Sequence, residues 1–197
     1  MAYPPKTYQD SSLPHLLEVI KAYPLATVIS VENNRPIVTH IPLVYKEGKL
    51  IGHLDKQNPQ AELLKNSQPV TAIFSGPQAY ISPSNFESEQ LPTWNYIFVH
   101  VQGNAIAISD VNAIKDSMVA MTHFLEAPDH KYILEQDNPR MEQLINYVSG
   151  FEIDITHWEG KFKLSQDKPH QEFEQAKEAL ITENQKSIQE FLRRLFK

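Results

Sequence analysis

Residues 25–54 read LATVISVENNRPIVTHIPLVYKEGKLIGHL, three apolar runs separated by two polar turns. The runs are Leu25–Val31, Ile37–Tyr45 and Leu50–Leu54. Their β-branched residues favour strands, and the Asn and Gly residues between the runs favour tight turns. The stretch therefore predicts three antiparallel strands joined by short turns at Glu32–Arg35 and Lys46–Lys49.

More strands are expected on the C-terminal side of this meander. They are Val70–Phe74, Ala79–Ser82, Trp94–Ile108, Phe151–Trp158 and Lys161–Leu164. We expect Ile73–Pro83 to form one hairpin and the last two strands to form another around Glu159-Gly160. Seven or eight short strands favour a closed barrel, because closure removes exposed strand edges. Gly103 is expected to mark a bulge or bend.

Helical patterns flank and interrupt these strands. They cover Leu13–Ala22, Asn58–Leu64, Asp110–Leu125, Asn138–Gly150 and Pro169–Lys197. Ser12, Asn58, Asp110 and Asn138 stand where N-caps are expected, and proline follows closely in three of these cases. We expect residues 1–168 to form one domain with inserted helices, and residues 169–197 to form a helical extension packed on it. Ile188, Phe191, Leu192 and Leu195 are among its apolar residues.

The composition bounds the class of protein. Of 197 residues, 41% are hydrophobic and 21% charged, as in ordinary globular domains. The 18 basic and 24 acidic side chains give a net charge of −6, which opposes non-specific binding to nucleic acid. The chain has no cysteine, which excludes disulfides and thiolate sites. With no signal-peptide pattern and no apolar run of about 20 residues, we expect a cytoplasmic protein without a membrane segment.

The familiar catalytic and nucleotide-binding motifs are absent, and the six glycines stand singly. Three of the eight histidines, His40, His53 and His100, lie on predicted strands. They could serve as metal or haem ligands, although their spacing matches no metal motif, or they could be separate barrel side chains. The sequence leaves both alternatives open.

The segment Gly52–Gln60, GHLDKQNPQ, is the strongest candidate for a binding site. It runs from a strand end through a polar turn into a helix that starts at Pro59. This arrangement gathers backbone N–H groups, Lys56 and the amide of Asn58 near a helix N-terminus, where phosphate groups bind. The alternative is an ordinary connection in which Asn58 only caps the helix.

Two further segments suit a flat, anionic ligand. Trp94 and Asn95 stand just before a long strand, where an aromatic ring and an amide could face a flat ring system. Lys161 and Lys163 alternate with apolar residues, so both lysines share one face of their strand. That face is either a basic wall for an anionic ligand or the solvated face of an edge strand.

Several of these stretches, taken in order, resemble the PaiB family of FMN-binding negative transcriptional regulators. The matching stretches are Pro24–Thr27, Thr39–Leu43, Gly52–Leu54, Asn58-Pro59, Phe74–Pro83, Pro92–Tyr96, Val99–Gly103 and Gly160–Pro169. The resemblance implies an α+β, mainly β fold: the split β-barrel of pyridoxamine-phosphate oxidases and flavin reductases, with flanking helices and a C-terminal helical segment. It also implies a homodimer with FMN between the subunits.

The resemblance also assigns roles to individual residues. The FMN phosphate would be held by His53, Lys56, Asn58 and Gln60, and the strand bearing Thr39 and His40 would run beneath the isoalloxazine ring. Trp94, Asn95, Lys161 and Lys163 are the further candidate cofactor contacts.

Our leading hypothesis is an FMN-binding protein with an indirect negative role in transcription, because no helix-turn-helix pattern is present and the net charge is negative. The second is a flavin-dependent oxidoreductase, since the cofactor can supply the chemistry. No acid-base pair in the sequence demands that enzymatic role. Haem or metal binding is the third hypothesis, and direct DNA contact is not expected.

Overall fold

The computed structural model describes residues 3–185 and divides them into two compact units. Unit 1 comprises residues 3–10, 76–98 and 160–185, and unit 2 comprises residues 11–75 and 99–159. The predicted division into residues 1–168 and 169–197 stays a prediction. Ile188, Phe191, Leu192 and Leu195 of the expected extension lie outside the described residues.

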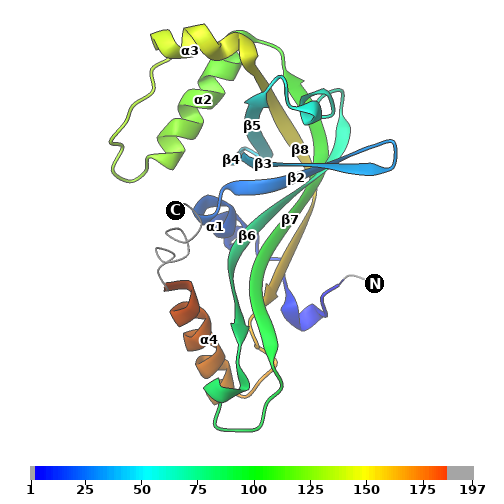
Figure 1. The fold of residues 1–197 in the computed structure, drawn as a ribbon, viewed down its shortest axis with the longest axis vertical. Helices are drawn as coiled ribbons and strands as arrows, with labels where there is room; N and C mark the ends of the chain where they lie inside the picture. The colour runs from blue at the N-terminus through cyan, green and yellow to red at the C-terminus, as the bar shows by residue number, and fades with distance from the viewer. Residues whose placement is uncertain (1–2, 186–197) are drawn as a thin grey trace, which may run out of the picture. The chain divides into compact units, whose positions relative to one another are not determined.

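One antiparallel sheet of eight strands forms the framework (Figure 1). The strands are β1 (Gln9–Asp10), β2 (Leu25–Glu32), β3 (Arg35–Pro42), β4 (Val44–Lys46), β5 (Lys49–Asp55), β6 (Gln68–Ile81), β7 (Thr93–Ile108) and β8 (Val148–Lys163). Their order is β3-β2-β6-β7-β8-β5-β4, with β1 paired to β8. Across residues 3–185 no ladder joins β3 to β4, so the expected closed barrel is wrong and the split β-barrel is confirmed.

The split arises at Leu43. The sequence predicted one strand over Ile37–Tyr45, but the chain changes partners in the middle of that stretch. Leu43 is buried and donates its N–H to Pro24 O at 2.9 Å. β3 pairs with β2, whereas β4 pairs with β5, so the two halves of the predicted strand reach opposite ends of the sheet path.

The two turns of the meander are as predicted. Asn33 and Asn34 have φ values of 49° and 62°, which matches the hairpin turn that Asn tolerates, and Glu32 pairs with Arg35 across it. Gly48 has a φ of 88° in the second turn, a conformation that glycine adopts without a steric penalty.

Both hairpins predicted further along are wrong, because β6 and β8 run on without a turn. In β6, Gly76 lies so close to β7 that an added Cβ would stand 3.1 Å from Ile97 O. In β8, Gly160 stays extended and pairs with Asp10 of β1. Gly76 therefore serves close strand packing, as Gly103 does against Asp154, and neither Gly76 nor Gly160 forms a turn.

For the helices of unit 2, the predicted starts are more accurate than the predicted ends. α1 spans Leu13–Ala22 and α2 spans Val111–Leu125, as expected. The segment after Asn58 forms only a four-residue 3-10 helix, η2 (Pro59–Glu62), and is shorter than predicted. The helix expected to end near Gly150 is α3 (Pro139–Leu144), followed by the 3-10 helix η4 (Ile145–Tyr147) and then β8.

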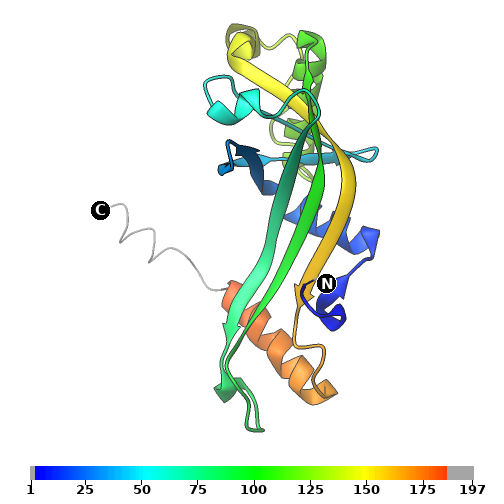
Figure 2. The same cartoon turned by 90° about the vertical axis from the view of Figure 1, so that its right-hand side faces the viewer.

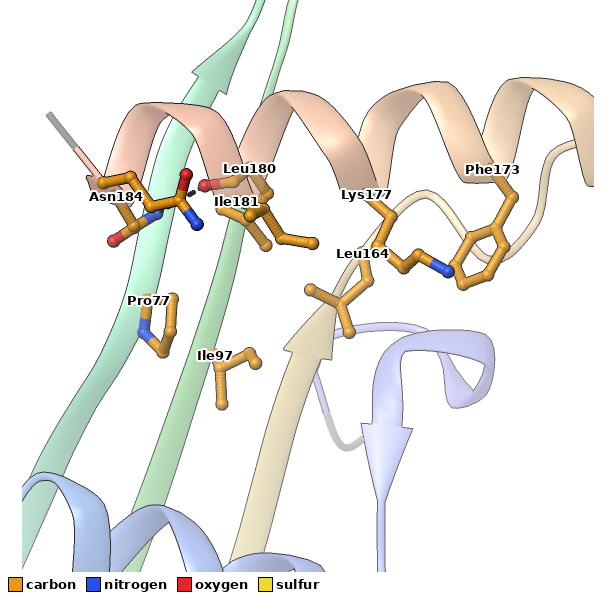
Figure 3. A pocket seen from close by; sticks show the side chains of 9 residues that line it. Pro77, Ile97, Leu164, Phe173, Lys177, Leu180, Ile181 and Asn184 are labelled. Atoms are coloured by element: carbon orange, nitrogen blue, oxygen red, sulfur yellow. Dashed lines mark hydrogen bonds between the residues drawn. The ribbon is translucent and has the colours of Figure 1, made fainter.

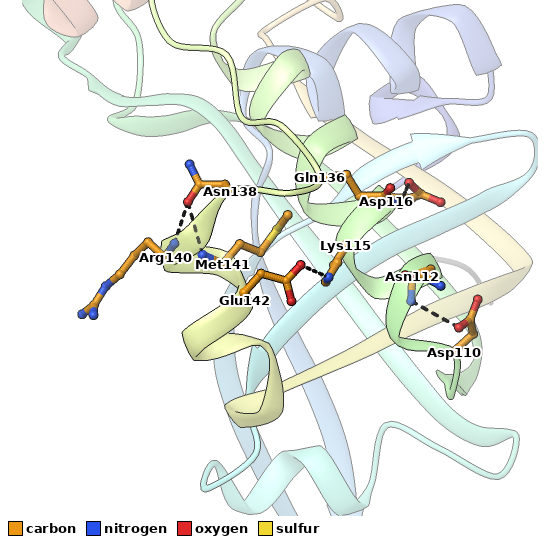
Figure 4. A network of polar contacts seen from close by, with 9 residues as sticks. All are labelled: Asp110, Asn112, Lys115, Asp116, Gln136, Asn138, Arg140, Met141 and Glu142. Atoms are coloured by element: carbon orange, nitrogen blue, oxygen red, sulfur yellow. Dashed lines mark hydrogen bonds and ion pairs between the residues drawn. The ribbon is translucent and has the colours of Figure 1, made fainter.

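Polar contacts connect α2 to α3 (Figure 4). Asp110 caps α2 by accepting from Asn112 N at 3.2 Å. Asn138 caps α3 in the same way. The buried Lys115 of α2 forms an ion pair with Glu142 of α3, so the burial of this ammonium group is compensated by a carboxylate.

Unit 1 is held together by the helix α4 (His170–Gln185). Ala176 and Leu180 of α4 pack against Ala79 and Ile81 of β6, and these four residues form a buried apolar cluster. Figure 2 shows the α4 ribbon beside the C-terminal part of β6. Another short 3-10 helix, η3 (Pro83–Asn85), follows β6, and η1 (Lys6–Tyr8) precedes β1. No helix within residues 3–185 has the length and apolar character needed to cross a membrane.

Candidate functional site

The predicted phosphate turn brings Thr39 and Asn58 together. Asn58 Nδ2 donates to Thr39 Oγ1 at 3.2 Å, which ties β3 to the start of η2. Asn58 Oδ1 accepts from Gln60 N at 2.9 Å and so caps η2. The Thr39 hydroxyl also lies 3.5 Å from the same Oδ1, at the limit for a hydrogen bond, so we assign the bond to Nδ2.

Gln60 lies beneath this turn and is 0% exposed. Its Nε2 group lies within 3.0–3.2 Å of Val28 O, Ser30 Oγ and Ile37 O. These bonds hold η2 against the β2–β3 hairpin, while the buried Oε1 has no protein partner. Gln60 therefore positions the turn from inside.

Lys56 supplies the positive charge of the turn. Its Nζ donates to Asn146 O at 2.7 Å, and its backbone N–H donates to Tyr147 O at 2.8 Å. Neither contact neutralises the ammonium, and the side chain is exposed. The preceding residue, Asp55, carries a carboxylate, and its Oδ1 accepts a hydrogen bond from Gln57 N at 2.7 Å.

The three strand histidines occupy separate environments. His53 is partly buried in β5, its Nδ1 has no hydrogen-bond partner, and burial lowers the pKa of its imidazole. His40 lies on the exposed side of β3 beside Thr27, with Nδ1 and Oγ1 3.1 Å apart. His100 lies 3.9 Å from Glu159. Within residues 3–185 no three His, Asp or Glu side chains gather closely enough to hold a metal ion.

Trp94 and Asn95 are neighbours in β7 but have opposite environments. Trp94 is 50% exposed; its Nε1 donates to Gln78 Oε1 at 3.3 Å and its ring lies 6.4 Å from that of Tyr80. Asn95 is 0% exposed, and its Oδ1 accepts from Ser165 Oγ at 3.1 Å. Its buried Nδ2 has no protein partner. The two predicted contacts are therefore not brought together.

Of the predicted basic wall, Lys163 lines a polar cavity in unit 1, whereas Lys161 is not among the lining residues. Lys161 donates to Tyr3 O at 2.8 Å, and Lys163 donates to Thr93 Oγ1. The cavity has a volume of about 570 Å³ and is lined by Tyr8, Glu89–Thr93, Lys163, Ser165, Asp167 and Lys168. Sequence reasoning missed Tyr8, Ser165 and Lys168, because only the β1–β8 pairing and the fold of the following loop bring them together.

A second cavity of unit 1 lies beneath α4 and is apolar (Figure 3). It has a volume of about 420 Å³ and is lined by Pro77, Ile97, Leu164, Phe173, Lys177, Leu180, Ile181, Asn184 and Gln185. Its one lysine, Lys177, is paired with Glu174. This cavity lacks the convergent polar groups that fix a charged ligand.

Comparison with known proteins agrees with this architecture. Residues 2–157 match the family model described as "Putative FMN-binding domain". The chain is 26% identical over 186 residues to the Bacillus subtilis protein named "Protease synthase and sporulation protein PAI 2", covering 92% of this chain and 90% of that protein. It is 32% identical over 112 residues to an uncharacterized Saccharomyces cerevisiae protein, covering 52% and 64% of the two chains.

Solved structures share the fold at low sequence identity. An FAD- and haem-binding protein from Mycobacterium smegmatis superposes with a TM-score of 0.66 at 19% identity, over 86% of this chain and 80% of that chain. A flavocytochrome from Azotobacter vinelandii gives a TM-score of 0.59 at 17% identity, over 79% and 69% of the two chains. At these identities the likeness shows the fold alone.

Proposed function

The chain belongs to the family described as "Putative FMN-binding domain", and from this premise we propose that it binds FMN and has an indirect negative role in transcription. The observation that carries the proposal is the match over residues 2–157, which includes the whole turn around Thr39, Lys56 and Asn58.

The residues of the turn suit a phosphate-bearing ligand. Lys56 offers an exposed ammonium whose hydrogen bond goes to an uncharged carbonyl. Because Thr39 Oγ1 accepts from Asn58, the Thr39 hydroxyl can still donate to a ligand oxygen. In the proposal Lys56 and Asn58 hold the phosphate, with Gln60 supporting the turn from below and His53 beside it. When bound, the flavin would supply electron or hydride transfer, which this chain's side chains do not themselves provide.

The FMN titration is the direct test. Wild-type protein should quench FMN fluorescence, and Lys56→Ala should weaken FMN binding by roughly tenfold, because one charge-assisted contact is lost at an exposed position. Riboflavin, which has no phosphate, should bind both proteins equally. Lys46→Ala, which removes another exposed lysine of unit 2, is the matched control. If the wild type neither quenches FMN nor shifts its absorbance, the proposal fails.

The regulatory part of the proposal concerns an indirect effect. The Bacillus relative is named "Protease synthase and sporulation protein PAI 2", and we take the regulatory part of the proposal from the family resemblance. The net charge of −6 opposes direct DNA contact. We therefore place the regulation in the flavin chemistry or in a protein partner, within the cytoplasm. A specific gel shift with purified protein at moderate salt would contradict the indirect route.

A homodimer is also part of the proposal. Val31 of β2 and Val38 of β3 are 65% and 50% exposed, and exposed apolar residues of this kind suit a subunit interface. Light scattering should then give twice the 22.6 kDa mass of the chain. The predicted cofactor contacts Trp94, Asn95, Lys161 and Lys163 belong to unit 1 and stay predictions.

A further inference from the structure

The polar cavity of unit 1 lies partly outside the family match. That match ends at residue 157, whereas Lys163, Ser165, Asp167 and Lys168 all follow it. The matched range therefore does not include the two lysines of this cavity. Its volume of about 570 Å³ lies within the usual range for small-molecule sites.

Two lysines give the cavity its positive charge. Lys163 Nζ donates to Thr93 Oγ1, and Lys168 Nζ donates to Gln90 Oε1. Both acceptors are uncharged, so these bonds orient the ammonium groups without neutralising them. Gln90 is itself held in place, because its Nε2 donates to Glu172 Oε2 at 2.9 Å. A ligand oxyanion would supply the missing negative charge.

The carboxylates of the cavity are otherwise engaged or solvated. Asp167 lies near the Tyr8 hydroxyl, and burial first, and this carboxylate second, raise the pKa of Tyr8. Glu89 is exposed to solvent, which screens its charge. Lys163 and Lys168 are both half-buried, so their attraction for an anion is screened less.

A buried serine, Ser165, forms part of the cavity wall. Ser165 is 3% exposed and has a φ of 64°, an uncommon conformation for a residue other than glycine. Its hydroxyl bonds to Asn95, whose buried Nδ2 has no protein partner. Strained backbone and unpartnered buried donors concentrate at binding sites, because the protein otherwise gains nothing from their cost.

We propose that this cavity binds a small molecule through an oxyanion group, phosphate or carboxylate, held between Lys163 and Lys168 with Ser165 in the wall. The site is additional to the turn around Lys56. Its anion could be that of a separate metabolite or the phosphate of FMN itself, and these two sources are separated by experiment.

The test is a titration of the full-length protein with inorganic phosphate and with acetate, followed by calorimetry and by the backbone amide signals of residues 163–168. Those signals should shift for the wild type. Lys163→Gln and Lys168→Gln should each weaken binding by about tenfold, the loss expected for one charge-assisted hydrogen bond. Lys177→Gln, on α4, should bind the anion as the wild type does, and Lys56→Gln separates the contribution of the phosphate turn in unit 2.

Ser165→Gly provides a variant that keeps the loop intact. Glycine adopts a φ of 64° without strain, so the fold is retained while the hydroxyl is lost. Because the Ser165 hydroxyl gives its one proton to Asn95 Oδ1, it positions the wall rather than donating to the anion, and we expect the affinity to change less than in the lysine variants. The proposal is overturned if neither anion shifts the loop signals, or if binding is lost in Lys56→Gln and retained in both cavity variants.

A parallel FMN and riboflavin titration identifies the source of the oxyanion. If the cavity variants weaken FMN binding and leave riboflavin binding unchanged, the cavity holds the FMN phosphate. If they weaken phosphate binding alone, it serves a separate ligand. Because inorganic phosphate is titrated without flavin, this proposal and FMN binding can fail independently.

Discussion

The bond between Asn58 and Thr39 is the contact of the proposed turn whose energy can be isolated most cleanly. Asn58→Ala removes two interactions at once: the cap on Gln60 N at 2.9 Å and the donation to Thr39 at 3.2 Å. A lost N-cap costs about 1 kcal/mol. A lost uncharged hydrogen bond costs about 1 kcal/mol more. We therefore expect Asn58→Ala to lower the free energy of unfolding by about 2 kcal/mol.

Thr39→Val removes only the second interaction, because valine has nearly the shape of threonine, and should cost about 1 kcal/mol. Once Asn58 is alanine, Thr39→Val has no bond left to break. The double variant should therefore be about as unstable as Asn58→Ala alone, with a coupling energy of about 1 kcal/mol.

Urea unfolding followed by tryptophan emission measures these values. The chain has two tryptophans, Trp94 in unit 1 and Trp158 in unit 2. A Trp94→Phe background leaves Trp158, which packs edge-on to Tyr45 at 6.0 Å and reports on the unit that contains the turn. Additive losses, near 3 kcal/mol in the double variant, would refute the assigned bond. Asn58→Ala should also weaken FMN binding, whereas Thr39→Val tests the hydroxyl alone.

Two further predictions concern the framework of unit 2. Gly103→Ala should destabilise the protein by about 3 kcal/mol, because the new methyl group would overlap Asp154 O and stand 2.6 Å from Ile153 Cγ2; a melting temperature within 2 °C of the wild type would contradict this. Burial lowers the pKa of His53 below its ordinary 6.5, so the native state binds fewer protons than the unfolded chain. The contribution of His53 to the free energy of unfolding should be fully present above pH 6.5 and should fall as the pH drops below it. His53→Gln should remove this pH dependence. An NMR titration midpoint of the His53 imidazole at or above 6.5 would contradict a buried, neutral ring.

Local chemistry explains the parts of the fold that the sequence predicts well. Asn33 and Asn34 tolerate positive φ, so the turn between β2 and β3 is decided within four residues. Asp110 accepts from Asn112 N and so fixes where α2 begins. These features depend on residues a few positions apart in the chain, so the sequence alone is enough to predict them.

Long-range partners decide the features that the sequence could not predict. Gly76 and Gly160 were interpreted as turn signals, yet both stay extended because of strands distant in the chain. Gly160 pairs with Asp10, at the other end of the sequence. The same pairing brings Tyr8 to the polar cavity, so a cavity assembled from three segments gave no local signal beyond Lys163.

The alternation of side chains along a strand also limits how the predicted cofactor contacts can act together. Thr39 and His40 are adjacent in β3, so their side chains point to opposite faces of the sheet. Thr39 bonds to Asn58, while His40 lies across from Thr27. If the phosphate is held at the turn around Asn58, the flavin ring should lie on the face of β3 that carries Thr39. His40 then points to the opposite face. His40→Ala should therefore change FMN affinity less than Thr39→Val, and the reverse order would place the ring on the outer face.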